Sequence, residues 1–287
     1  MPRAMAQIEP MTTIAYLGPA GTFSEEAALA YAASLPDATL LPLASIPAVV
    51  TAIETDAATV GVLPIENLLE GSVNYTLDLL IHETSLQIAG EIVIPIRQYL
   101  AARPGVQLSE AAVLYAHPQS LGQCRKFIER CLPGVATVAS LSNSAALREA
   151  LADERPAVAI TTRRAAELLE AAVLARDIAD NLGNVTRFIV LARADAPPTG
   201  DDKTSFCFGF TEDRAGTLVG ALLELAEEQI NMTKLESRPS RAVLGQYIFL
   251  VDINGHREEA HVARALARIR ARTGMFKVFG SYPRWKG

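Results

Sequence analysis

Short apolar runs and longer amphipathic stretches alternate over the first 190 or so residues of the chain. The runs typical of strands are 13–17, 39–43, 59–63, 113–116, 136–139, 157–161 and 187–191, and the stretches typical of helices are 25–33, 46–55, 121–131 and one that opens at 142–146. Strands that alternate with helices predict layers of α/β structure with mostly parallel sheets.

The segment 87–100 breaks this alternation. It is rich in β-branched and apolar residues and is longer than a usual strand. A long extended segment of this kind is suited to cross from one lobe to another. We therefore predict two α/β lobes with a crossover near residues 85–100.

The pattern changes after residue 193. Residues 194–202 are polar and rich in proline, as interdomain linkers are. Beyond them, strand-like and helix-like segments follow in the order 206–210, 218–225, 230–238, 246–253, 262–269 and 276–279. This βαββαβ order is the ferredoxin-like arrangement. The predicted domains are therefore 12–193 and 204–287, joined by a linker at 194–203.

Composition narrows the classes of function. With 287 residues, 50% hydrophobic, the chain is expected to form about two globular domains. A net charge of −6 and the lack of a basic patch argue against nucleic acid as the partner. The sequence has neither a membrane-length apolar run nor a signal-like start, and its three cysteines have no CxxC spacing, so a cytoplasmic protein that binds small molecules is expected.

Polar turns follow several of the predicted strands, where ligands bind in open α/β sheets. Gly18–Ser24 and Ser142–Ala146 each open a helix, whose first N–H groups can meet an anion. Glu66 and Asn67 follow the strand at 59–63, and Asp180–Phe188 enters the strand at 187–191. Each motif also has a purely local interpretation. Gly18–Ser24 could be an ordinary connection from strand to helix, Ser142–Ala146 and Glu66–Asn67 could cap helices, and Asn181 and Asn184 could shape a turn.

Four segments of the chain carry a family likeness. Gly18-Pro19-Ala20-Gly21-Thr22-Phe23-Ser24, Pro64-Ile65-Glu66-Asn67, His117-Pro118-Gln119 and Asn184-Val185-Thr186-Arg187-Phe188 occur in the order seen in prephenate dehydratases. The segment after the linker resembles the ACT regulatory domain of that family. The likeness extends from about Ile14 to Pro283 and implies a two-lobed catalytic region like that of periplasmic binding proteins.

The resemblance implies decarboxylative dehydration of prephenate to phenylpyruvate, in phenylalanine biosynthesis, without metal or cofactor. It makes Thr186 the group that assists departure of the ring hydroxyl, Arg187 a carboxylate-binding group and Phe188 an apolar wall. The remaining substrate-binding residues that it implies are Thr22, Phe23, Ser24, Glu66, Asn67, Ser144 and Asn181. Leu68 stands where the family usually has serine.

The resemblance also implies feedback inhibition by L-phenylalanine. Glu236-Ser237-Arg238-Pro239 matches the family's regulatory motif. In the family, a Gly-Ala-Leu run earlier in the domain completes the effector site. We assign this run to Gly216-Thr217-Leu218, which follows Asp213. The alternative is Gly220-Ala221-Leu222, but Gly220 would lie inside a helix with its N–H already bonded. Asn231 is expected at the same site. Thr217 and Ala215 depart from the family's alanine and proline.

Three alternatives remain open from the sequence. The substrate could be arogenate, whose amino group replaces the keto oxygen of prephenate. A two-lobed small-anion binding protein with a sensor domain would share the same architecture. The C-terminal domain could serve only for assembly, and a homodimer or homotetramer through the ACT and catalytic domains is expected in any case.

Overall fold

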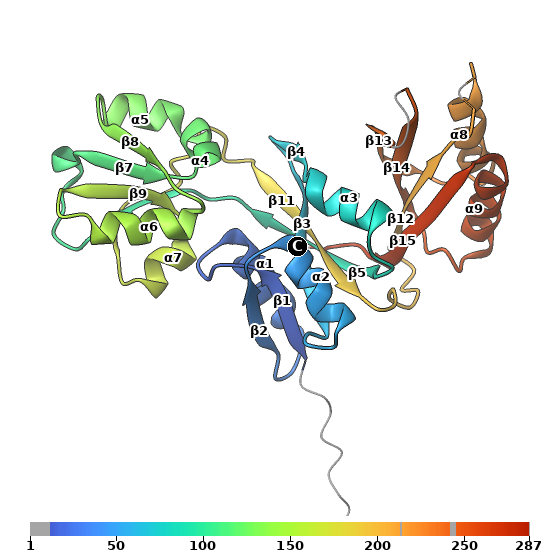
Figure 1. Ribbon diagram of the computed structural model, residues 1–287, viewed down its shortest axis with the longest axis horizontal. Helices are drawn as coiled ribbons and strands as arrows, with labels where there is room; N and C mark the ends of the chain where they lie inside the picture. Colours follow the sequence, from blue (N-terminus) through green and yellow to red (C-terminus); the bar gives the residue numbers. More distant parts are fainter. Residues whose placement is uncertain (1–11, 213, 242–244, 287) are drawn as a thin grey trace, which may run out of the picture. The chain divides into compact units, whose positions relative to one another are not determined.

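The computed structural model describes residues 12–212, 214–241 and 245–286. They separate into two compact units: unit 1 contains the chain up to Ser72 and Val93–Phe188, and unit 2 contains Val73–Ile92 and the chain from Ile189 onward. Figure 1 gives the element labels used below.

The first lobe, in unit 1, is a sheet with helices packed on it. It contains β1 (Thr13–Leu17), α1 (Phe23–Ala32), β2 (Thr39–Leu43), α2 (Ile46–Glu54), β3 (Val60–Asn67) and β4 (Gly71–Ser72). β1 pairs in parallel with both β2 and β3. Thr22 and Ser45 cap α1 and α2 with their side-chain oxygens, as hydroxyl residues before a helix commonly do.

Two long strands complete this sheet, whose order is β2-β1-β3-β11-β5. They are β5 (Gln87–Pro95) and β11 (Val185–Ala192). Residues of both strands are divided between the two units. The predicted crossover therefore corresponds to β5, and β11 returns the chain to the same sheet.

The second lobe, also in unit 1, has the strand order β10-β6-β9-β7-β8. Its elements are β6 (Tyr99–Ala102), the 3₁₀ turn η1 (Leu108–Glu110), β7 (Val113–Ala116), α4 (Pro118–Gln123), α5 (Arg125–Cys131), β8 (Ala136–Ala139), α6 (Asn143–Ala152), β9 (Ala157–Thr161), α7 (Arg163–Leu168) and β10 (Ala172–Ala175). Figure 1 shows α4 and α5 on one side of this sheet and α6 and α7 on the other. Apolar clusters lie on both sides, one with Leu114 and Ile160 and one with Val113 and Leu147.

Unit 2 contains an antiparallel sheet of order β13-β14-β12-β15. Its elements are β12 (Asp202–Gly209), α8 (Thr217–Glu227), β13 (Met232–Pro239), β14 (Tyr247–Asn254), α9 (Ala260–Arg272) and β15 (Met275–Pro283). α8 and α9 cover one face, where Phe206, Phe208 and Val262 are buried together. Figure 1 shows α3 (Asn74–His82) on the other side of the sheet.

Charged contacts fasten α3 to this sheet. Arg238 Nη2 lies 3.0 Å from Asp78 Oδ1, and Arg241 Nη2 lies 2.5 Å from Asp78 Oδ2. At the other end of the helix, Lys277 Nζ donates to the carbonyl oxygens of Leu80 and Thr84, each at 2.6 Å. A cation at the C-terminus of a helix satisfies carbonyls that have no partner within the helix.

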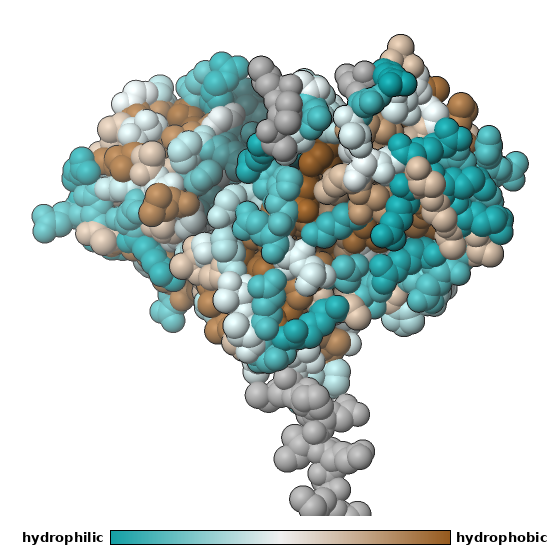
Figure 2. Space-filling model, turned by 45° about the vertical axis from the view of Figure 1, so that its right-hand side comes forward, coloured by the Kyte–Doolittle hydropathy of each residue, from teal (hydrophilic) through white to brown (hydrophobic). Residues whose placement is uncertain are grey.

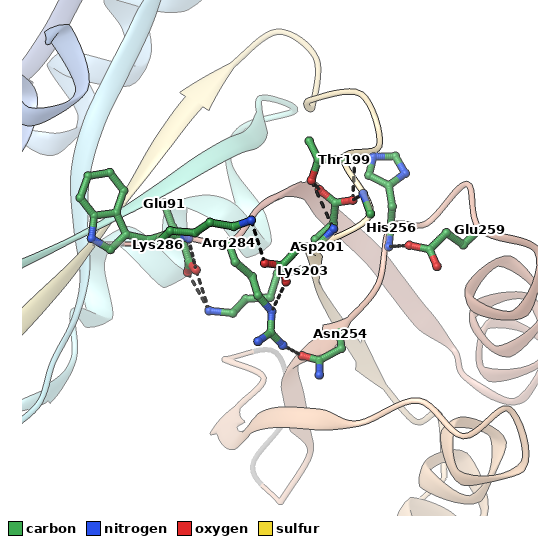
Figure 3. Close-up of polar contacts among 12 residues, drawn as sticks. Glu91, Thr199, Asp201, Lys203, Asn254, His256, Glu259, Arg284 and Lys286 are labelled. Carbon is green, nitrogen blue, oxygen red and sulfur yellow. Dashed lines mark hydrogen bonds and ion pairs between the residues drawn. The ribbon is translucent and has the colours of Figure 1, made fainter. Parts of the chain in front are cut away.

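The linker and β5 are also tied to the C-terminal sheet. Lys203 on β12 contacts both carboxylate oxygens of Glu91 at 2.8 Å, and the side chain of Glu91 is 3% exposed. Figure 3 shows this pair and, farther along the linker, Thr199, whose hydroxyl donates to Asp202 at 2.6 Å. The buried ring of His256 contacts the carbonyl of Ala196 at 2.9 Å. The proline-rich segment is thus held by the domain that follows it.

The expected fold class is confirmed: two α/β lobes precede a βαββαβ domain. The sheets are less uniformly parallel than predicted, because β6 pairs antiparallel with both β9 and β10. The helix expected at 121–131 is broken at Cys124 into α4 and α5. The domain boundaries at 12–193 and 204–287 stay a prediction, and α3 and part of β5 belong by their contacts to the same unit as the C-terminal sheet.

The surface is mixed in character. Hydrophilic residues predominate on the face shown in Figure 2, with hydrophobic residues scattered among them. Among the residues that the structure describes, no helix is both long enough and apolar enough to span a membrane.

Candidate functional site

The centre of the candidate site is a side-chain pair between β3 and β11. Asn67 Nδ2 lies 2.8 Å from Thr186 Oγ1, and the same nitrogen lies 3.2 Å from the carbonyl oxygen of Val185. Thr186 is 8% exposed. Two segments that are 119 residues apart in the chain are therefore joined at the predicted catalytic hydroxyl.

The hydrogen bonds around Asn67 fix which way its amide points. Its Oδ1 accepts from the backbone N–H groups of Leu69 at 3.0 Å and Glu70 at 3.1 Å. An oxygen must face those two donors, so the NH₂ group faces Thr186. The Thr186 oxygen then accepts a hydrogen bond, and its own hydrogen points elsewhere. A hydroxyl that accepts one hydrogen bond is a better donor of another.

A second pair, between Arg187 and Glu66, lies on the opposite face of the sheet. Arg187 Nη2 is 3.2 Å from Glu66 Oε2, and the arginine side chain is 12% exposed. Side chains of consecutive strand residues point to opposite faces, so Arg187 points away from the face that carries Thr186. The carboxylate-binding role expected of Arg187 stays a prediction, and it would require this ion pair to open.

Asn184 is a polar residue whose importance the sequence did not reveal. It is 1% exposed, and neither its Nδ2 nor its Oδ1 has a hydrogen-bond partner among the described residues. It precedes Thr186 by two positions, and Phe188, 2% exposed, follows Thr186 by two. The sequence favours a turn-forming role for this asparagine. Turn residues are usually exposed, however, and this amide is buried without a hydrogen-bond partner among the described residues.

The loop before α1 has a well-defined local structure. Thr22 Oγ1 accepts from Glu25 N at 3.4 Å and donates to the carbonyl oxygen of Pro19 at 3.0 Å. The N–H of Gly21 donates to the carboxylate of Glu25 at 2.6 Å. Thr22 therefore acts as a helix cap, and the glycine amide is already occupied by a protein carboxylate. Any substrate anion would have to use the amides of the first turn, at Phe23 and Ser24.

Ser144 lies against the same loop. Its hydroxyl donates to the carbonyl oxygen of Ala20 at 2.6 Å, and the residue is 1% exposed. The cap of α6 is the preceding Ser142, which accepts from Ala145 N at 3.0 Å. The structure thus brings Ser144 together with the Gly18–Ser24 turn, as expected of residues of one site. The contact that joins them is a hydrogen bond within the protein, from Ser144 to the carbonyl of Ala20.

Asn181 is not brought to Thr186. Its Oδ1 accepts from the N–H of Gly183 at 2.8 Å, and the residue is exposed. This is the turn-shaping contact that asparagine commonly makes. Its predicted contact with substrate remains a prediction.

The predicted effector residues lie on two elements of unit 2. Gly216 is the N-cap of α8 with φ of 87°, and Gly220 N donates to Gly216 O at 2.9 Å, as expected for a glycine inside the helix. Thr217 begins α8 and Leu218 packs against the core of the domain. Asp213 lies outside the described residues.

The remaining effector residues are on or near β13. Glu236 and Arg238 point to the face that carries α3, while Ser237 points to the other face and, like Asn231, is exposed. Arg238 is committed to Asp78 and Asn74 of α3, so one predicted effector residue connects the motif to a helix 160 residues earlier in the chain. Within the described part of the chain, no group of three or more histidine, cysteine, aspartate or glutamate side chains could hold a metal ion.

The chain was compared with known proteins. Residues 14–196 match the family model of prephenate dehydratase. The bifunctional chorismate mutase/prephenate dehydratase of Aquifex aeolicus is 42% identical over 98% of this chain and 76% of its own length. The structure of prephenate dehydratase from Arthrobacter aurescens in complex with L-Phe is 35% identical, with a TM-score of 0.86 over 95% of this chain and 90% of that one.

Another similar structure carries a different activity in its description. The quorum quenching acylase GqqA is 30% identical, with a TM-score of 0.83 over 96% of this chain and 98% of that one. The family model covers well over half of the chain and includes Thr186, Asn67 and the Gly18–Ser24 turn. On these matches, the chain belongs to the prephenate dehydratase family.

Proposed function

We propose that this chain catalyses the decarboxylative dehydration of prephenate to phenylpyruvate with Thr186 as the group that assists the leaving hydroxyl. The observation that carries the assignment is the hydrogen bond from Asn67 Nδ2 to Thr186 Oγ1, at 2.8 Å. Because the threonine oxygen accepts this bond, its hydrogen is available to the substrate.

The reaction breaks two bonds and makes an aromatic ring. The bond between the ring and its carboxylate breaks, carbon dioxide leaves, and the electron pair enters the ring as the ring hydroxyl departs with a proton as water. Negative charge develops on the departing oxygen. A donor already aimed at that oxygen stabilises the transition state more than the ground state. A threonine is too weak an acid to give up its proton freely, so its contribution is a hydrogen bond that strengthens as the charge develops.

The substrate is a dianion, so the site must bind two carboxylates. We assign one to the start of α1, where the backbone N–H groups of Phe23 and Ser24, after the cap Thr22, lack partners within the helix. Arg187, near the start of β11, is the candidate for the other; its guanidinium would have to leave Glu66 and turn from the opposite face of the sheet toward Thr186. Phe188 supports the wall behind Thr186, and Ser144 holds the Ala20 carbonyl of the substrate-binding turn.

Replacing Thr186 tests the assignment. Thr186→Val is expected to lower kcat by roughly 10²- to 10⁴-fold, the usual loss when a positioned proton donor is removed, and to change KM little. Thr186→Ser should recover most of the activity. Thr39→Val, the same change at an exposed position of β2, serves as the matched control. Formation of phenylpyruvate, followed spectroscopically, is the measurement, and unchanged turnover in Thr186→Val would remove this residue from the mechanism.

The same assay decides between substrates. Prephenate and arogenate are offered side by side to the wild-type protein, and the preferred substrate is the one with the higher kcat/KM. We propose prephenate. Failure to turn over either compound, with tight binding retained, would instead indicate the small-anion binding protein.

The surroundings of Thr186 do not favour an acylase. A threonine that attacks an amide needs a base to take its proton. The partner of this hydroxyl within the described residues is the Asn67 amide, which donates to it. The contact therefore suits a hydrogen-bond donor toward a leaving group better than a nucleophile.

We further propose that L-phenylalanine inhibits the enzyme by binding at the C-terminal domain, as a complex with L-Phe exists for the Arthrobacter relative. Gly216 opens the 11-residue helix α8 without a side-chain cap, which leaves its first turn open to a carboxylate. The proposed site also includes Thr217, Leu218, Asn231, Glu236, Ser237 and Arg238.

Calorimetry with phenylalanine tests this site. If phenylalanine produces neither a heat of binding nor inhibition, the domain has only a role in assembly. For the assembly itself we propose a cytoplasmic homodimer or homotetramer.

A further inference from the structure

The turn between β1 and α1 contacts the second lobe so closely that one of its residues must be glycine. Gly21 has φ of 85°, and a Cβ built at this position would lie 2.8 Å from Ser144 Oγ and 2.9 Å from Ala165 Cβ. Distances below 3 Å cannot be accommodated without moving the neighbours. The Gly18–Ser24 turn therefore lies directly on the N-terminal ends of α6 and α7.

Two buried hydroxyls of the second lobe hold consecutive carbonyls of this turn. Thr162 Oγ1 donates to Gly21 O at 2.7 Å, and Ser144 Oγ donates to Ala20 O at 2.6 Å. Thr162 is 0% exposed and Ser144 is 1% exposed. Both bonds are short, and both hydroxyl side chains are shielded from solvent.

A third contact involves the N–H of the Ala20–Gly21 peptide, whose carbonyl accepts from Ser144. The N–H of Gly21 donates to Glu25 Oε2 at 2.6 Å, and Arg164 Nε lies 3.4 Å from that same oxygen. Arg164 belongs to α7, the helix that Thr162 caps by accepting from Ala165 N at 2.9 Å. The carbonyl of Gly21 is thus bonded to the cap of α7, and its amide is bonded to a carboxylate that also contacts Arg164 of α7.

We propose that Thr162 is a positioning residue for the dehydratase reaction: its bond to Gly21, together with that of Ser144 to Ala20, sets the orientation of the Gly18–Ser24 turn and so aims the first amides of α1 at a substrate carboxylate. This inference rests on the proposed function. Thr162 is fully buried and acts only through the turn. Since the turn meets the carboxylate in both the ground state and the transition state, loss of its orientation weakens binding of both.

The kinetic test separates positioning from mere stability. At a temperature well below unfolding, Thr162→Val is expected to raise KM for prephenate on the order of tenfold, the effect of one buried carbonyl left unpaired, with kcat within about threefold of wild type. Thr162→Ser, which restores the hydroxyl, should restore KM. Ser45→Ala removes the comparable cap of α2 without touching the turn and is the matched control.

Hydrogen–deuterium exchange of the substrate-free protein gives a second readout. The amides of Gly21–Ser24 should exchange faster in Thr162→Val and in Ser144→Ala than in wild type and in Ser45→Ala. Ser144→Ala does not remove a helix cap, so it decides the matter if Thr162→Val does not fold. A lower Tm with unchanged KM in Thr162→Val, or unchanged exchange of the turn in Ser144→Ala, would overturn the proposal. If wild type fails to turn over prephenate, the proposed function is lost, whereas the exchange result still shows whether these hydroxyls hold the turn.

Discussion

At the scale of single residues, Asn184 combines burial with unsatisfied polarity. A buried amide without hydrogen-bond partners destabilises the folded state, and such residues are retained mainly where function requires them. Asn184 is 1% exposed and lies two positions before Thr186. We therefore infer that its amide serves the substrate and not the fold.

Replacing Asn184 by leucine, a side chain of similar size, should separate these two effects. Asn184→Leu is expected to raise stability by about 1 to 3 kcal/mol, since an unpaired polar group is removed. It should lower kcat/KM for prephenate by roughly tenfold or more, because a hydrogen bond to a charged substrate is lost. Thermal denaturation and steady-state kinetics measure the two quantities, and a variant that is both less stable and fully active would contradict the inference.

Glu26 predicts a pH dependence of stability. Burial raises the pKa of its carboxyl group to about 7, with further upward contributions from Glu167 and Glu25, against the lowering effects of a backbone N–H of Arg164 and the charge of Arg163. The folded state therefore holds this proton at pH values where the unfolded chain has released it. Stability contributed by the neutral form is present below about pH 4.5 and is lost as the pH rises through 7.

Glu26→Gln should remove that loss. The variant is expected to match wild type near pH 5 and to exceed it near pH 8 by on the order of 2 to 3 kcal/mol. Chemical denaturation at the two pH values is the measurement, with the pH 5 experiment as the internal control. An equal effect of the substitution at both pH values would show that Glu26 does not carry the raised pKa.

At the scale of elements, α3 depends on partners from the C-terminal sheet. Asp78 is 8% exposed at its side chain and pairs with Arg238 and Arg241. Asp78→Asn keeps the shape but removes the charge, so we expect a loss of about 1 to 3 kcal/mol and a weaker response to phenylalanine. Glu83→Gln, an exposed change at the C-terminal end of α3, is the control. Chemical denaturation measures the loss of stability, and inhibition curves with phenylalanine measure the response to the effector. Normal inhibition in Asp78→Asn would exclude the contacts of Asp78 with Arg238 and Arg241 from regulation.

The elements differ in how far the sequence could predict them. Short apolar runs located β1, β2, β7, β8 and β9 to the residue. The apolar run indicates a strand that ends at residue 63, whereas β3 continues to Asn67, because the paired strand β4 extends the ladder beyond that run. β10 was not predicted, since its four residues are mostly half-exposed and become a strand by pairing with β6.

The candidate site was predictable in its residue types but not in its partners. The order of the family motifs along the chain identified Thr186 and Asn67 as site residues. Their hydrogen bond forms because β3 and β11 are neighbours in the sheet, and the hydrophobic pattern does not indicate which strands are neighbours. Arg238 was assigned to an effector, whereas its pairing with Asp78 depends on the docking of α3. Thr162 carried no motif, because a threonine before a helix is a common cap. Long-range partners depend on topology, which local patterns do not encode.

At the scale of the whole molecule, truncation tests whether the regulatory domain is separable. A chain ending after Ala194 loses Arg238, Lys203 and Lys277, the cations that meet Asp78, Glu91 and the last carbonyls of α3. Two buried carboxylates, Asp78 and Glu91, would then lose these cations, which is destabilising. We expect a lower Tm and faster amide exchange in α3, together with loss of phenylalanine inhibition. Wild-type protection of α3 in the truncated chain would show that the helix folds independently of these contacts.

The docking of α3 and β5 also limits how such enzymes can recombine. A chimera that joins residues 1–193 to the regulatory domain of a relative receives its buried anions from one parent and its cations from the other. It should fold only where the donor supplies cations at the positions of Lys203 and Arg238 and an amine at that of Lys277. For this chain the linker is therefore a poor point of exchange, and a working graft would carry α3 along with its sheet.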